Sequence, residues 1–263
     1  MKGADFCGLR LHWNYDKWFV DISVPTYVRK ALEKLNHTTP SLPQHVPYKG
    51  VPITYGKQPH NTQEPDNTPF LSKEDTRHIQ RNVGTFLYYA RAVDTTIHPA
   101  INDMSITQAK STQQTKIAAD MFIDYLSTHQ NTTLTFYKSD MQAYVDSDAA
   151  YLLSPQAKSR AAGYFYLSIQ NTTHPIPTKP PLNAPIHVEC TCSKHIVSSA
   201  AVTETGALFH NCKVAIGLKN MLESLGHKQT IQVKIDDATT SALCNATLEQ
   251  KKKQKNWTWD GIG

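Results

Sequence analysis

Long apolar runs are missing from this chain of 263 residues. None approaches the about 20 residues that a helix needs to cross a bilayer. The amino-terminal segment MKGADFCGLRLHW lacks the continuous apolar stretch of a secretory leader. We therefore expect an intracellular protein without a membrane partner, in either the cytoplasm or the nucleus.

Cysteine is also scarce, with five residues in the chain, and only Cys190 and Cys192 lie close together. An odd number of scattered cysteines indicates reduced thiols and no disulfides. Together with His187 and His195, these two cysteines suggest a zinc site, but no second ligand pair follows at a suitable spacing. The alternative, two small apolar side chains that pack against a helix, is the preferred interpretation.

A strong excess of one charge is absent as well, because 27 Lys and Arg stand against 22 Asp and Glu, a net charge of +5. This balance favours an anionic partner only weakly. A cluster of lysines near residue 250 is a candidate nucleic-acid-binding segment, with a solvated helix face as the alternative. Its members are Lys251, Lys252, Lys253 and Lys255. Tyr164 and Tyr166 alternate on a predicted strand, where base stacking and cross-strand packing explain them equally well.

The first half of the chain predicts a mainly helical unit over residues 1–132. Strand-like segments at 6–13 and 18–25 form a hairpin that leads into a helix ending near Leu35. Residues 37–70 are rich in Pro, Thr, Gln, Asn and His, which predicts an extended irregular segment. Ser72 followed by Asp75 is typical of a helix start. Two further helices are expected at 99–109 and 112–128.

The second half, 133–263, predicts an α/β domain with the order β-β-β-α-β-α. Three consecutive strands suggest an antiparallel meander, and a long helix and a further strand follow them. The expected strands are 134–146, 162–169, 184–192 and 230–236, and the expected helices are 201–225 and 240–254.

Three acidic residues, Asp146, Glu204 and Asp236, stand where an ordinary surface position explains them poorly. Asp146 follows apolar Tyr144 and Val145. Asp236 ends an alternating strand. Glu204 begins a helical stripe that points toward the sheet. The stripe continues through Leu208, Cys212, Ala215, Leu222 and Leu225.

Carboxylates that converge in this way repel one another unless a cation or protons lie between them. They are hard oxygen ligands of the kind that Mg²⁺ prefers. Two Mg²⁺ ions about 4 Å apart can promote phosphodiester hydrolysis by assisting both the attacking water and the leaving oxygen. The three acids therefore suggest a metal-dependent nuclease.

Several segments, taken in order, resemble the end of a copia-type retrotransposon polyprotein, where reverse transcriptase passes into ribonuclease H. The resemblance covers nearly the whole chain. The amino-terminal segments that resemble it are FCGLRLHW, VDISVPTYVRKALEKL and LYYARAVD, and the later ones are YVDSDAAYL, KSRAAGYFYLS, SSAAVTETGALFHN and VKIDDATT.

The resemblance implies Mg²⁺-dependent hydrolysis of RNA in RNA–DNA hybrids, with Asp146, Glu204 and Asp236 as catalytic metal ligands. Asp148 and Asp237 would be supporting residues at most. Ser198 and Ser199 match a small polar stretch that leads into the helix Glu and would position it locally.

The resemblance also implies that the pattern is incomplete. The Tyr-x-Asp-Asp signature of the polymerase site does not occur, and Thr258 stands where these elements usually carry an Asp, with Asp260 out of register. We expect an incomplete ribonuclease H-like mixed sheet, preceded by a thumb- or connection-like unit of reverse transcriptase. The remaining polyprotein parts would be partners. A non-catalytic nucleic-acid-binding remnant and a decayed reading frame stay open as alternatives.

Overall fold

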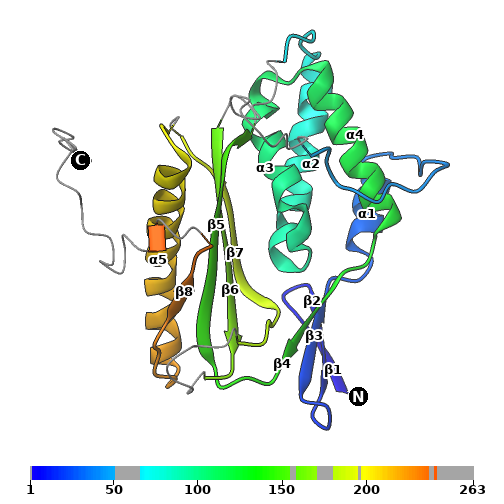
Figure 1. Ribbon diagram of the computed structural model, residues 1–263. Coiled ribbons are helices and arrows are strands. Elements are labelled where there is room, and N and C mark those ends of the chain that lie inside the picture. The colour runs from blue at the N-terminus through cyan, green and yellow to red at the C-terminus, as the bar shows by residue number, and fades with distance from the viewer. Residues whose placement is uncertain are drawn as a thin grey trace, which may run out of the picture.

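The computed structural model describes residues 2–50, 66–154, 158–170, 180–194, 197–236 and 240–241. This part of the chain forms two four-stranded sheets and five α-helices, a mixed α/β architecture (Figure 1). Within it, no helix is both long and apolar enough to cross a membrane. The predicted helix at 240–254 falls outside these ranges except for residues 240–241, which are helical, and the lysine cluster near residue 250 falls outside them entirely.

The first sheet is antiparallel, in the order β1-β2-β3-β4. Its strands are β1 (Lys2–Phe6), β2 (Leu9–Asn14), β3 (Phe19–Ser23) and β4 (Thr133–Tyr137). The predicted hairpin is present as β2 and β3, and β1 extends it. The unit over 1–132 therefore contains three strands of this sheet as well as the expected helices, and β4 follows directly after it.

The predicted strand 134–146 is wrong as a single element. β4 pairs with β3 of the first sheet, whereas β5 (Gln142–Ser154) begins the second sheet. The chain turns between them, where the Met141 amide donates to the Ser139 hydroxyl and Met141 has a positive φ of 59°. A positive φ at Met141 interrupts the extended backbone between β4 and β5. The turn thus sends two adjacent strands into different sheets.

The helices of the first unit surround one apolar core. Ser72 caps α2 by accepting a hydrogen bond from the Asp75 amide, as predicted, and Thr112 caps α4 together with Thr115. Phe86 of α2 and Phe122 of α4 are fully buried and meet edge to face in this core. The helices are α1 (Tyr27–Lys34), α2 (Lys73–Ala92), η1 (Thr95–Ile97), α3 (His98–Thr107), η2 (Gln108–Lys110) and α4 (Gln113–Thr128).

The second sheet has the order β7-β6-β5-β8. The predicted meander is confirmed: β5, β6 (Lys158–Ser168) and β7 (Pro185–Cys192) pair antiparallel. The long helix α5 (Ala200–Ser224) then crosses the sheet and returns the chain to β8 (Gln232–Lys234), which pairs parallel with β5. Gly226, with a φ of 91°, ends the helical path before that return.

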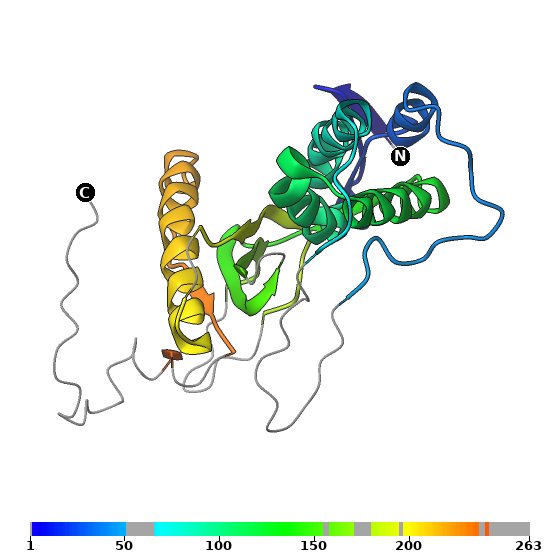
Figure 2. The same ribbon diagram turned by 90° about the horizontal axis from the view of Figure 1, so that it is seen from above.

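The second sheet separates α5 from the helices of the first unit (Figure 2). On one face, Val145 and Phe165 pack with Ala215 of α5. Toward the other unit, α3 contacts β7, where the Asn102 side chain donates to the Cys190 carbonyl. The helix that carries Glu204 is therefore held on one side of the sheet.

Candidate metal centre

Glu204 lies in the first turns of α5, close to the helix start. Ser199 caps the helix by accepting a hydrogen bond from the Val202 amide at 3.3 Å. This agrees with the predicted positioning role of the small polar stretch before Glu204. The glutamate side chain is half-buried.

The buried stripe of α5 agrees with the predicted one at Ala215 and Leu222, whereas in the first half of the helix it lies one position earlier than predicted. Its members are Thr203, Ala207, Asn211, Ala215 and Leu222. Leu225, predicted on this stripe, is 67% exposed. Glu204 therefore lies beside the buried stripe, at the margin between α5 and the sheet.

Three carboxylates from different elements converge at this margin. Oxygen atoms of Asp148, Glu204 and Asp236 all lie within 4.8 Å of one another, and they form the one such acidic group among the described residues. The parallel ladder explains two of them, because Asp146 of β5 is level with Lys234 of β8. Two residues further along both strands, Asp148 comes next to Asp236.

The structure thus joins two of the three predicted acids, and the third member of the group is Asp148 in place of Asp146. Val145 packs with Ala215 of α5, and the Ser147 hydroxyl accepts a hydrogen bond from Asn211 of α5. Since side chains alternate along a strand, Asp146 and Asp148 both lie on the face opposite to Val145 and Ser147. What separates them is their position along β5, where Asp146 is level with Lys234.

On that face Asp146 lies in a tyrosine-rich environment. It is paired across the strands with Tyr164, and its charge adds to the effect of burial in raising the pKa of Tyr164. Burial, followed by the charge of Asp146, raises the pKa of Tyr166 to about 12. Both phenols are therefore neutral at physiological pH.

The negative charges of the acidic group act on Asp148, although Asp148 and Asp236 are both exposed and Glu204 is half-buried. Partial burial raises the pKa of the Asp148 carboxyl, and the negative charge of Asp236 raises it further. A hydrogen bond of 2.8 Å from the Ala149 amide opposes this rise. An oxygen-rich group in which one acid resists ionisation suits a hard divalent cation, which would take the place of the proton. The residues present therefore fit Mg²⁺.

The described cysteines do not form a comparable centre. Burial raises the pKa of the Cys190 thiol to about 11, so this side chain is a poor thiolate ligand. The Cys192 thiol donates to the Asn102 side-chain oxygen at 2.8 Å. His195 lies outside the described residues. Among those that are described, no metal-ligating group contains Cys190, Cys192 or His187.

The two tyrosines left open by the sequence are packed within the protein. The Tyr164 hydroxyl donates to the Asn183 carbonyl at 2.8 Å, and Tyr166 is 1% exposed and stacks on Tyr144. Cross-strand packing accounts for both.

No protein-family model matches this chain, and neither a curated protein nor a solved structure is significantly similar to it.

Proposed function

We propose that this chain carries a metal-dependent phosphodiester hydrolase site of the ribonuclease H type, inherited from a copia-type retroelement polyprotein. The observation that supports it best is the convergence of Asp148, Glu204 and Asp236, which come from three elements distant in sequence. The preferred substrate is the RNA strand of an RNA–DNA hybrid. Other parts of the retroelement polyprotein are the expected partners.

The order of elements supports the same proposal. The elements are three antiparallel strands, a crossover helix and a strand parallel to the first, and the acids lie on β5, on α5 and two residues after β8. Asp236 therefore follows a strand end, and Glu204 lies where the helix begins. This is the order that the resemblance implies for a ribonuclease H site.

In this proposal Asp148, Glu204 and Asp236 hold Mg²⁺ through their carboxylate oxygens. When bound, Mg²⁺ supplies Lewis acidity toward the scissile phosphate and lowers the pKa of a coordinated water. The protein holds the carboxylates in place by two means. The β5–β8 ladder aligns the two aspartates, and the capped start of α5 positions the glutamate. Asp146, on the tyrosine-rich face, acts in the same proposal as a neighbouring acid that orients the group.

Cleavage of a labelled RNA–DNA hybrid in the presence of Mg²⁺ tests this proposal. We expect Glu204→Gln and Asp236→Asn to reduce cleavage by more than about 100-fold, because each removes a ligand. Asp148→Asn should behave like them, whereas Asp146→Asn should lose about 10- to 100-fold, as expected for a residue outside the ligand set.

The matched pair Asp146→Asn and Asp148→Asn makes the test specific, since each variant removes one charge from β5. Full loss in Asp146→Asn with activity retained in Asp148→Asn would assign the ligand role to Asp146. Cleavage that survives in Glu204→Gln would show that the acidic group is not the catalytic site.

A nucleic-acid-binding module without catalysis is the second candidate. Thr258, at a position where the resembled elements carry an Asp, favours it because a fourth acid would be missing. Binding of the hybrid without cleavage, together with Mg²⁺ affinity unchanged by Glu204→Gln, would support this candidate over the hydrolase.

A further inference from the structure

The exposed face of α2 carries a stripe of four cations. At about 100° per residue, Lys73, Arg77, Arg81 and Arg91 lie within about 80° of one another around the helix axis. All four are exposed. The stripe is about 27 Å long, because 18 residues at about 1.5 Å each separate its ends.

These four cations have no described counter-ion, in contrast to several basic residues of the other helices. Arg29 pairs with Glu33, Lys116 with Asp120 and Lys219 with Glu223, each one helical turn apart. No ion pair between the α2 cations and another residue in the described ranges is present. An ordinary solvated helix face that is held by salt bridges would show such pairs.

The acids of α2 itself do not neutralise the stripe. Asp75 is used at the helix start, where it accepts a hydrogen bond of 2.7 Å from the Ser72 hydroxyl. Glu74 lies about 20° beyond the edge of the stripe and three residues before Arg77, so one acid stands beside four cations. The stripe therefore presents an excess of positive charge to the solvent.

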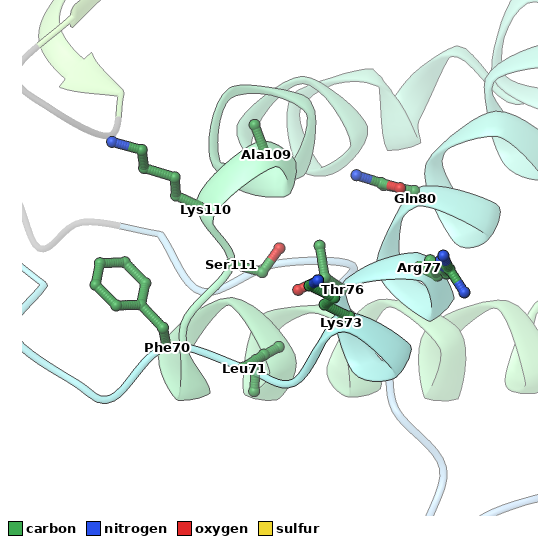
Figure 3. Close-up of a pocket in the computed structure, with 9 residues that line it drawn as sticks. All are labelled: Phe70, Leu71, Lys73, Thr76, Arg77, Gln80, Ala109, Lys110 and Ser111. Carbon is green, nitrogen blue, oxygen red and sulfur yellow. The ribbon is translucent and has the colours of Figure 1, made fainter.

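An open hollow of about 540 Å³ continues the stripe at the amino-terminal end of α2 (Figure 3). Lys73 and Arg77 line it from α2, and Lys110 lines it from η2. Phe70, which is 73% exposed, borders the same hollow, and its ring and the Lys110 side chain extend to the same side. Phe70 and the three cations therefore share one open surface.

A second exposed aromatic lies within the stripe. Tyr88, 43% exposed, falls between Arg81 and Arg91 on the same sector of α2. Gly84, also on this sector, has no neighbouring atom within 4 Å of the place where a Cβ would be. The face is therefore open around Gly84, and within α2 it carries one aromatic ring, Tyr88, among its four cations.

We propose that this face of α2, with Phe70 and Lys110, binds single-stranded nucleic acid. Phosphates would lie along the cations, and unpaired bases would stack on Phe70 and Tyr88, an arrangement used for binding without sequence preference. At a spacing of about 3.4 Å per charge, the stripe is long enough for about eight phosphates of one strand. The surface is separate from the acidic group and needs no metal, so it stands independently of the proposed hydrolase function.

Fluorescence anisotropy with labelled oligo(dT) and oligo(U) of 12 nucleotides, in EDTA and over a series of salt concentrations, tests the proposal. The test variant is R77Q/R81Q/R91Q. For single strands each lost phosphate contact reduces the slope of log K against log salt by about 0.7, so the triple variant should lose about two units of slope. Phe70→Ala should weaken binding by about 5- to 150-fold, because one stacked base is lost.

The matched control is R29Q/K116Q/K219Q, which removes the same charge from paired positions outside the stripe. Its slope of log K against log salt should stay within about 0.7 of the wild-type slope, the value of one phosphate contact. Circular dichroism establishes that both triple variants are folded. An equal loss in the control would attribute binding to net charge and overturn the proposal. Equal or tighter binding of a duplex of the same length, or of poly-glutamate, would overturn the assignment to single strands.

Discussion

Asn211 is the polar contact by which α5 is docked on the sheet, and its truncation gives a specific test of the fold. The side chain is fully buried, and its amide donates to the Ser147 hydroxyl of β5 and to the Ala162 carbonyl of β6, both at 2.8 Å. In Asn211→Ala both acceptors lose this donor, at about 1–3 kcal/mol for each buried group left unsatisfied.

Part of that loss is recovered, because the Asn211 side-chain oxygen is buried without a hydrogen-bond partner in the described structure. Its removal relieves one desolvated polar atom. We therefore expect Asn211→Ala to lower the free energy of unfolding by about 2–4 kcal/mol. For a chain of this size that corresponds to a fall in melting temperature of about 4–16 °C.

Gly163 allows a sharper test, because its lack of a side chain leaves the room that the Asn211 side chain occupies. A Cβ at Gly163 would lie 2.4 Å from the Asn211 side-chain oxygen and 2.8 Å from its Cγ. Gly163→Ala should therefore destabilise the wild-type protein. In the Asn211→Ala background it should cost less, by a coupling of about 0.5–3 kcal/mol. A residual cost should remain, because Phe165 also lies 2.8 Å from the added Cβ.

Urea unfolding followed by circular dichroism measures the free energy of unfolding of four proteins: wild type, Gly163→Ala, Asn211→Ala and the double variant. Thr205→Ala serves as the control on α5, because Thr205 is exposed, and its change should stay within about 0.5 kcal/mol of wild type. Strictly additive effects of Gly163→Ala and Asn211→Ala, or a loss below about 0.5 kcal/mol in Asn211→Ala, would refute this packing argument.

Four further outcomes follow from the charges and burial of single groups. Because the pKa of Asp148 is raised in the folded protein, its ionisation lowers the stability of the fold as pH rises. Asp148→Asn should therefore have a higher melting temperature than wild type in EDTA at pH 7.5. Added Mg²⁺ should raise the melting temperature of the wild type only. Burial lowers the pKa of His98 below its usual 6.5, so the unfolded state gains the proton first. Stability should fall as pH drops below about 6.5, and it should fall less in His98→Gln. Arg160→Met leaves the largely buried Asp103 without its cation and should cost about 1–3 kcal/mol in urea unfolding, with Arg160→Lys closer to wild type. With its pKa near 11, Cys190 should resist alkylation at pH 8, whereas exposed Cys7 reacts, and equal rates would contradict its burial.

The sequence predicted the helices well because their signals are local. The Ser72 and Asp75 pair marks the start of α2, and the polar stretch before Glu204 marks the start of α5, as the capping bonds show. A cap is decided within four residues, so no distant part of the chain needs to be known. The meander of β5, β6 and β7 follows the same logic, since consecutive strands usually pair.

The division of the strands between two sheets was not predictable in this way. β4 pairs with β3 from more than a hundred residues earlier, and Thr135 donates to Asp21 across that pair at 2.6 Å. The alternating pattern of 134–146 is equally compatible with one long strand. The partners of β4 depend on the long-range packing of the helices in between, which a local pattern does not encode.

The choice between Asp146 and Asp148 has the same origin. The two residues are one strand repeat apart, so they share a face by alternation, and a register shift of two residues would exchange them without moving any side chain to the other face. What distinguishes them is their surroundings. Asp146 is level with Lys234 of β8 and paired with Tyr164, whereas Asp148 stands next to Asp236. Like charges accumulate only at the second position, so a cation gains most there. Metal affinity, measured as the Mg²⁺-dependent rise in melting temperature, should therefore be lost in Asp148→Asn and largely kept in Asp146→Asn, and the reverse order would place β5 two residues out of this register.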